Sequence, residues 1–219
     1  KKMIGWLETM THPDGDISFF NDAALEIAPK LNELKKYAQR LGLDFNSTKF
    51  NKVTHLSSSG YIRLSSNSVV VLLDVARIGP DYQPGHAHAD TLSFEISLFG
   101  QRVLVNGGTS EYGNSLVRHH ERSTMAHNTV VVDNQNSSEV WSGFRVARRA
   151  YPFDLQIEQS DQLTSISCSH DGYTRLNGKP IHKREWQFLD SSLIIKDSIK
   201  GPFSSANASS LNWDNSPLN

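Results

Sequence analysis

The sequence predicts a mainly β protein, an antiparallel β-sandwich preceded by a short α-helical segment. From about residue 53 onward, apolar and polar residues alternate in short runs that Gly, Asn, Asp and Pro separate. No helical pattern intervenes between these runs, and parallel strands would need such crossovers, so antiparallel pairing is expected. The expected strands, about nine in number, are 60–66, 68–76, 91–99, 102–106, 128–133, 144–150, 163–169, 182–189 and 192–199.

The first 45 residues show a helical pattern, so we expect a helical segment over 1–45 and the sandwich domain over 46–219. Pro29 suits the first turn of a helix that ends near Gly42. Apolar residues fall at steps of three and four along this helix and predict one buried face. They are Leu31, Leu34, Tyr37, Ala38 and Leu41.

Composition excludes several classes of partner. The chain has 22 Lys and Arg against 23 Asp and Glu, and a formal charge of −1 provides no overall attraction for nucleic acid or a membrane. No apolar run reaches the roughly 20 residues that cross a bilayer, and the first ten residues do not read as a signal peptide. Cys168 is the single cysteine and is expected to be a packed thiol within a strand. Both ends look cut, so we expect a fragment of a longer protein.

Histidines mark one candidate site. His86 and His88 have the same parity in "GHAHADTLSFEISLFG", so in an extended segment both side chains point to one side. His127 precedes a predicted strand, and Asn106 ends another. Zinc binds imidazole nitrogens and accepts an oxygen ligand, here from Asn106 or Asp90. A hydrogen-bonded loop without metal is the alternative.

A second candidate site is cationic, with Arg118 and Arg122 before His127 and Arg145 in "GFRVARRA". Guanidinium groups bind carboxylates and sulfates through paired hydrogen bonds, so these residues are candidates for an anionic substrate. A solvated strand face is the alternative. Tyr112 lies in the loop after Asn106 and could act as a general acid or base, or be an ordinary packing residue.

The region from about 82 to 152 resembles the heparinase II/III-like family of polysaccharide lyases. Two stretches carry the resemblance, "HAHADTLSFEISLFGQRVLVNGGTSEYG" and "RHHERSTMAHNTVVVDNQNSSEVWSGFRVARR". "HPDGDISFFNDAALEIAP" resembles the junction between the domains of such lyases. The resemblance implies an N-terminal α/α toroid, an antiparallel β-sandwich and a substrate cleft between them, so residues 1–45 would be the end of the toroid.

The resemblance also implies roles for individual residues. A structural zinc is expected on two histidines and an aspartate, and His88 and His127 match the two histidines. Asn106 stands at the expected aspartate position, which removes a negative charge and weakens a metal site, so Asn106 could instead hydrogen-bond His88 or His127. His86 matches the histidine that faces the substrate.

The implied reaction is β-elimination at a uronic acid of an acidic polysaccharide, with His86 and Tyr112 as catalytic residues and Arg118, Arg122 and Arg145 as substrate-binding residues. Other catalytic groups are expected from the toroid, so this chain alone would lack a complete active site. A periplasmic or extracellular location is implied as well. The alternative function is a non-catalytic carbohydrate-binding or assembly module of a surface-polysaccharide system.

Overall fold

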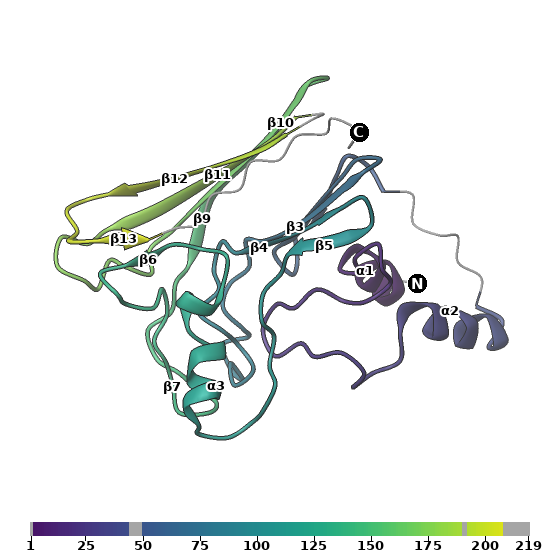
Figure 1. Cartoon of the computed structure of the whole chain (residues 1–219), viewed down its shortest axis with the longest axis horizontal. Helices are drawn as coiled ribbons and strands as arrows, with labels where there is room; N and C mark the ends of the chain where they lie inside the picture. The colour runs from purple at the N-terminus through teal and green to yellow at the C-terminus, as the bar shows by residue number, and fades with distance from the viewer. Residues whose placement is uncertain (1, 44–49, 190–191, 208–219) are drawn as a thin grey trace.

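A computed structural model describes residues 2–43, 50–189 and 192–207 of the chain. The predicted domain boundary between residues 45 and 46 lies outside these ranges. The predicted fold class is confirmed, because the described residues form mainly antiparallel sheets with a few short helices. Figure 1 shows the two large sheets lying against each other, with the helices at one side and below.

Two antiparallel sheets make the sandwich, and in each sheet strands that are consecutive in the sequence lie side by side. The first has the order β1-β2-β3-β4-β5 and the second β12-β11-β10-β9. The strands of the first sheet are β1 (Val53–Leu56), β2 (Tyr61–Ser65), β3 (Val69–Asp74), β4 (Phe94–Leu98) and β5 (Gln101–Leu104). Those of the second are β9 (Pro152–Gln159), β10 (Leu163–His170), β11 (Ile181–Leu189) and β12 (Leu193–Lys200).

The main core lies between these sheets. Phe94 and Ile96 of β4 belong to the same apolar cluster as Trp186 and Phe188 of β11. Along β11 the buried and less buried residues alternate, as expected for a strand with one face on a core. Cys168 is buried here as a free thiol, and burial raises its pKa to about 12, which agrees with the predicted packed thiol.

The central strand β3 is buried along its whole length because both faces of the first sheet are covered. Val70 and Leu72 point away from the main core and pack with Met10 and Phe20 of the N-terminal segment. This explains why the sequence of β3 is an apolar run and not an alternating pattern.

The N-terminal segment contains α1 (Lys2–Thr9) and α2 (Leu31–Arg40), separated by turns and extended chain. The predicted buried face of the second helix is wrong, because among its five apolar residues only Ala38 is buried, and Tyr37 and Leu41 are exposed. Figure 1 shows the reason: α2 lies beyond α1 at the edge of the molecule, away from the sheets.

Buried polar contacts attach the N-terminal segment to the first sheet. His12 Nε2 lies 2.8 Å from Glu95 Oε2, and the other oxygen of Glu95 accepts a hydrogen bond from the backbone N–H of Phe19. Arg63 donates to the backbone carbonyls of Thr9 and Thr11. These contacts set where residues 19–22 run, at the end of the sheet that carries the histidine loop.

The connection from β5 to β9 is irregular and contains most of the predicted polar residues. It includes α3 (Leu116–Glu121), a 3₁₀ turn η1 (Thr124–Ala126), and the two-residue strands β6 (Val131–Val132), β7 (Val140–Trp141) and β8 (Arg145–Val146). β6 pairs with β13 (Ala206–Asn207) and β7 with β8. The strands expected over 128–133 and 144–150 are therefore much shorter than predicted.

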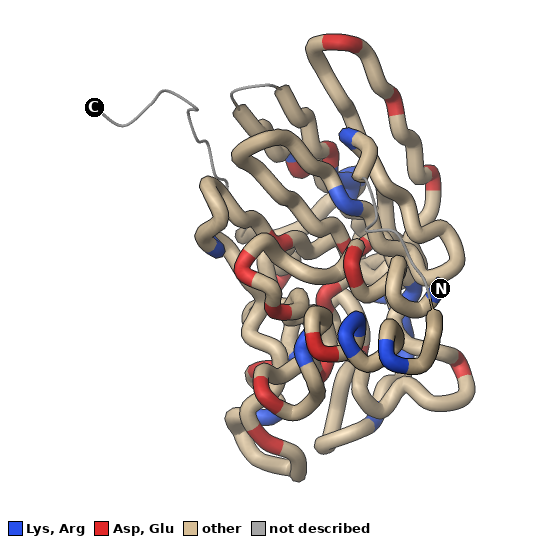
Figure 2. Tube along the Cα trace, turned by 90° about the vertical axis from the view of Figure 1, so that its right-hand side faces the viewer, with Lys and Arg blue, Asp and Glu red and all other residues tan. Residues whose placement is uncertain are grey.

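Figure 2 shows positively and negatively charged residues interspersed along the chain, in keeping with the near-neutral charge. None of the helices within the described ranges is both long enough and apolar enough to span a bilayer.

Candidate active site

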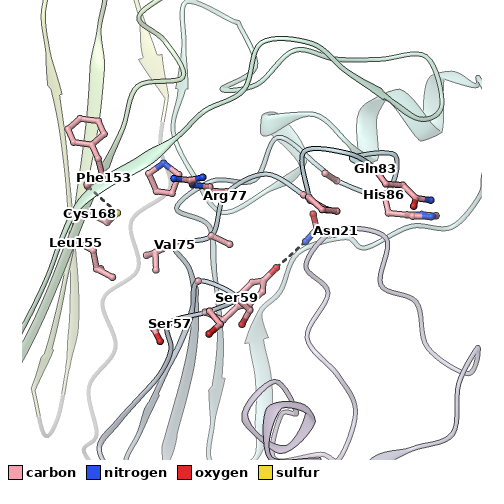
Figure 3. Close-up of a pocket in the computed structure, with 18 residues that line it drawn as sticks. Asn21, Ser57, Ser59, Val75, Arg77, Gln83, His86, Phe153, Leu155 and Cys168 are labelled. Carbon is pink, nitrogen blue, oxygen red and sulfur yellow. Dashed lines mark hydrogen bonds between the residues drawn. The ribbon is translucent and has the colours of Figure 1, made fainter. Parts of the chain in front are cut away.

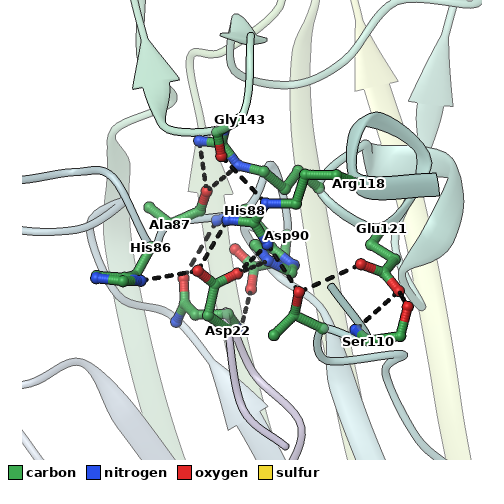
Figure 4. Close-up of polar contacts among 12 residues, drawn as sticks. Asp22, His86, Ala87, His88, Asp90, Ser110, Arg118, Glu121 and Gly143 are labelled. Carbon is green, nitrogen blue, oxygen red and sulfur yellow. Dashed lines mark hydrogen bonds and ion pairs between the residues drawn. The ribbon is translucent and has the colours of Figure 1, made fainter. Parts of the chain in front are cut away.

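Asp22 is the centre of the candidate site. Its Oδ2 lies 2.8 Å from His86 Nδ1, and its Oδ1 lies 2.7 Å from His88 Nε2. Both terminal nitrogens of Arg118 also donate to this carboxylate. In Figure 4 the three partners surround Asp22, which reaches them from the N-terminal segment. The site therefore joins parts of the chain that lie between 64 and 96 residues apart.

The charge of Asp22 follows from these partners. Burial opposes ionisation, but the hydrogen bonds from His88, Arg118 and His86 outweigh it and hold the pKa of the carboxyl well below its usual value. Ionised Asp22 can only accept hydrogen bonds. His86 must therefore carry its proton on Nδ1 and His88 must carry one on Nε2.

Close backbone contacts position Asp22. The backbone N–H of Thr109 donates to the carbonyl of Ala23 over 3.0 Å. Gly108, at φ +59°, permits this approach, because a Cβ there would lie 2.1 Å from the Ala23 carbonyl oxygen. On the other side the backbone N–H of Asn21 lies 3.4 Å from Asp90 Oδ2. Asp90 therefore braces the segment that carries Asp22, and burial raises its pKa to about 6.

His86 is the accessible member of the cluster. Its side chain is 60% exposed, whereas that of His88 is fully buried. No described residue hydrogen-bonds to Nε2 of His86. The ring meets Tyr112 and Phe144 edge-on, at centroid distances of 6.0 and 6.2 Å. His86 thus presents Nε2 to solvent beside two exposed aromatic rings.

The second pair of residues, His127 and Asn106, lies next to His88. His127 Nδ1 is 3.1 Å from Asn106 Oδ1, and the ring centroids of His88 and His127 are 5.2 Å apart. The backbone N–H of Asn128 also donates to Asn106 Oδ1, so this oxygen is the acceptor and His127 carries its proton on Nδ1. Burial, followed by the nearby His88, lowers the pKa of His127 to about 3.

These hydrogen bonds use one nitrogen of each ring and leave His88 Nδ1 and His127 Nε2 as the second nitrogens of the pair. Both nitrogens are buried and have no hydrogen-bond partner within the described part of the chain. Each imidazole is oriented by an oxygen on its other nitrogen, the arrangement usual for metal-binding histidines. The two nitrogens fit a zinc ion in this respect, although no third His, Cys, Asp or Glu of the described residues completes a cluster with them.

Asn106 takes the second of its two predicted roles in this structure. Its side-chain oxygen accepts from His127 Nδ1, on the opposite side of the ring from the free nitrogen. Its backbone N–H donates to Glu95, the residue that also holds His12 and Phe19. The amide therefore orients His127, and the expectation of Asn106 as a metal ligand has no support in the geometry.

The three predicted arginines have different surroundings. Arg118 is fully buried, with its guanidinium on Asp22, Thr109 and the carbonyl of Gly143. Arg122 is also buried and makes four hydrogen bonds to backbone carbonyls, so a substrate contact would require breaking them. Arg145 is exposed, and no described residue pairs with its guanidinium. Only Arg145 of the three is placed to meet a substrate directly.

The family of the chain follows from a comparison with family models. The model of the heparinase II/III-like C-terminal domain matches residues 49–216. The chain belongs to this family. The match covers all of the two large sheets, the β3–β4 connection that carries His86 and His88, and the β5–β9 connection that carries His127.

Solved structures agree with this fold for the heparinase II/III-like domain. Heparan sulfate lyase HepC from Pedobacter heparinus has 21% identity and a TM-score of 0.68, and the match covers 91% of this chain and 32% of that one. The heparinase III BT4657 gene product has 19% identity and a TM-score of 0.68, with the same coverage. The chain thus spans about a third of the solved structures that it matches. No curated protein matches it.

The heparinase II/III-like domain brings together five of the eight predicted site residues in direct contact with one another or with Asp22, and Tyr112 packs against His86. Those five are His86, His88, Asn106, Arg118 and His127. Asp22 was missed as a site residue, although its stretch "FFND" was noted as a junction. A single acid in this stretch carries no local signal that could reveal a partner in a distant loop.

Proposed function

We propose that this heparinase II/III-like domain is part of a polysaccharide lyase that cleaves an acidic, uronate-containing glycan by β-elimination. One observation carries the proposal: ionised Asp22 holds His86 Nδ1, so the exposed Nε2 is left as a base. The same carboxylate stabilises the imidazolium that forms when Nε2 takes a proton.

In the proposed reaction three side chains each have one role. His86 Nε2 removes the proton on the carbon next to the uronate carboxyl group, and the electrons form an enolate. Exposed Arg145 supplies positive charge for that enolate. The enolate then collapses, a carbon–carbon double bond forms, and the bond to the glycosidic oxygen breaks. Tyr112, whose ring lies against His86, donates the proton to that oxygen. No water is consumed.

Arg118 acts through Asp22 in this scheme. Its guanidinium contacts both carboxylate oxygens and keeps them directed toward the two histidines. Arg122 holds the loop through the carbonyl of Ala87, between those histidines. Both arginines are therefore positioning residues, and neither is assigned a substrate contact.

We also propose that His88 Nδ1 and His127 Nε2 hold a structural zinc ion. When bound, the ion would crosslink the histidine loop to the segment before β6 and would take no part in the elimination. Metal analysis of the purified chain tests this. We expect His88→Ala and His127→Ala each to abolish bound zinc while His120→Ala retains it. Zinc content unchanged by either substitution would contradict the assignment.

The activity is tested on the protein as its gene encodes it, including any sequence before Lys1, because the matched structures are about three times longer. We expect an acidic polysaccharide in a panel to yield products with the ultraviolet absorbance of a conjugated enoate. His86→Ala should lower the rate by about 10²–10⁴-fold, and exposed His120→Ala should leave it unchanged. Full activity of His86→Ala would overturn the assignment of the base.

A non-catalytic carbohydrate-binding module is the second candidate, favoured by the fact that Tyr112 is the only proposed acid and Arg145 the only accessible predicted cation. It predicts glycan binding that survives His86→Ala, with no turnover of any glycan in the panel. We further propose that the protein acts in the periplasm or outside the cell and that a toroid domain completes its cleft. Fractionation of cells that produce the whole protein tests the location.

A further inference from the structure

A large cavity begins at His86 and extends away from the Asp22 cluster. Its volume is about 880 Å³, within the usual range for ligand sites. It reaches from His86 and Gln83, past Arg77, to Phe153 and Leu155 on β9, and the turn between β1 and β2 forms another wall. Figure 3 shows Arg77 between the β9 side and the His86 side.

The lining of the cavity is polar at its walls and carries no acid. No Asp or Glu is among the described residues that line it. Hydroxyl and amide groups come from Ser57, Ser58, Ser59, Asn21 and Gln83. Such groups donate and accept hydrogen bonds, as sugar hydroxyls require. The absence of carboxylates from this lining avoids repulsion of a negatively charged ligand.

Arg77 provides the positive charge in this cavity. Its side chain is exposed, and the described residues offer it no hydrogen bond or ion pair. Its guanidinium lies 5.9 Å from the centre of the Tyr151 ring. The nearby arginines differ, because Arg149 pairs with Asp81 and Arg148 with Glu139. Arg77 is therefore a free guanidinium held at the cavity by an aromatic ring.

The floor of the cavity is apolar. Val75, Leu155 and Cys168 lie there at the open end of the sandwich, and Phe153 is a partly exposed ring at one side. Sugar rings have apolar C–H faces, and these pack on aromatic and aliphatic side chains. The combination of apolar floor, hydroxyl-rich wall and one free cation matches a charged sugar better than a purely apolar ligand.

We propose that this cavity is a binding subsite for an acidic sugar of the glycan chain, adjacent to the residue that reacts at His86, and that Arg77 binds its carboxylate or sulfate group. The inference rests on the proposed function, because the sugar in the cavity is taken to be the neighbour, in the same glycan chain, of the sugar that reacts at His86. A guanidinium binds either anionic group through two parallel hydrogen bonds.

Binding of defined tetrasaccharides tests the subsite. Kd is measured by calorimetry for a non-sulfated uronate tetrasaccharide, its sulfated form and a neutral one, with the His86→Ala protein used so that no ligand is consumed. We expect Arg77→Ala to raise Kd for an acidic tetrasaccharide about 10-fold. Arg77→Lys should have a smaller effect, because it keeps the charge without the paired donors. The acidic form that loses more affinity identifies carboxylate or sulfate as the bound group.

Arg40→Ala is the matched control. Arg40 is also an exposed arginine over a tyrosine ring, 5.7 Å from the centre of Tyr37, and lies on α2 outside the cavity. Its substitution should leave Kd unchanged. Ser57→Trp, which fills the exposed wall, should weaken binding as Arg77→Ala does. Equal losses for Arg40→Ala and Arg77→Ala, or no preference for acidic over neutral sugars, would overturn the subsite.

The result separates the subsite from the proposed reaction. If acidic tetrasaccharides bind through Arg77 while the whole protein with His86 intact produces no unsaturated product, the lyase assignment fails and the subsite stands. If the protein is a lyase but Arg77→Ala changes neither Kd nor KM, the subsite fails and the lyase assignment stands.

Discussion

Asp22 determines at the residue scale which histidine nitrogens are free. One carboxylate contacts His86, His88 and Arg118, so the ring nitrogens that it leaves uncontacted are Nε2 of His86 and Nδ1 of His88. The exposed nitrogen serves as the proposed base and the buried one as the proposed metal ligand. A single residue thus separates the roles of two histidines that are one residue apart in the sequence.

Removing the charge of Asp22 should destabilise the fold. Asp22→Asn leaves the buried guanidinium of Arg118 without its counterion, and we expect a loss of about 3 kcal/mol in the free energy of unfolding. Denaturation by urea measures this loss. The double variant Asp22→Asn with Arg118→Met should be more stable than the sum of the single losses implies. Strictly additive losses would contradict the coupling.

The sequence predicted some features of the site residues and missed others. The parity of His86 and His88 predicted that both rings lie on one side, and in the structure one carboxylate contacts both rings. The different exposure of the two rings could not be predicted, because it depends on the N-terminal segment that covers His88. Asp22 was missed for the same reason, since its role depends on a contact 64 residues along the chain.

At the scale of elements, two neighbouring glycines offer a clean test of how the N-terminal segment is held. Gly108→Ala would place a Cβ against the Ala23 carbonyl and force an alanine to φ +59°. We expect it to cost about 2 kcal/mol of stability and to increase hydrogen exchange at the Thr109 amide. Gly107→Ala is the control, because nothing lies within 4 Å of its Cβ. Equal effects of both substitutions would show that the close approach is not important.

Strands were predicted well where one face, or both faces as in β3, is buried against other parts of the molecule. The long hairpin strands of the sandwich have clear period-two patterns, and β3, β4, β10, β11 and β12 lie within or close to their predicted ranges. Strand β9 was not predicted, because it begins with Pro152 and is mostly exposed. The run 144–150 was predicted as a strand from its composition, but Arg145 and Arg148 are exposed and only Arg145–Val146 pair.

At the scale of the whole molecule, buried neutral histidines make the stability dependent on pH. Burial lowers the pKa of His127 to about 3 and also lowers those of His170 and His182. In the unfolded chain these groups bind protons below their ordinary pKa of about 6.5. The unfolded state therefore binds more protons as the pH falls through that value, and the folded state loses relative stability.

We expect the buried histidines to lower the free energy of unfolding between about pH 7 and pH 5, with about 2 kcal/mol from His127 alone at the lower pH. The raised pKa of buried Asp90 acts in the opposite direction over this range, because its protonation favours the folded state. Urea denaturation across this range measures it. Replacing exposed His120 with Gln should not alter the slope, and neither should replacing other exposed groups. The contribution of His127 is the difference in slope between the natural chain and the His127→Gln variant, and equal slopes would contradict neutral burial of this histidine.

The sandwich as a whole was predictable because a sequence pattern of period two reports directly on a sheet with one face on a core. The arrangement of the candidate site was not, since it requires the N-terminal segment, the histidine loop and the connection after β5 to meet at one end of that sandwich. Buried contacts of His12, Glu95 and Arg63 hold the N-terminal segment against the first sheet at that end. Polar pairs so distant in sequence have no local signal.

The most direct test of the central claim is mass spectrometry of the products that the whole protein forms from a defined uronate tetrasaccharide. Elimination conserves all atoms of the substrate, so we predict two products whose masses sum to that of the tetrasaccharide, one of them with a new double bond. Products whose summed mass exceeds the substrate by one water would mean hydrolysis and would contradict the account of His86 as the base of an elimination.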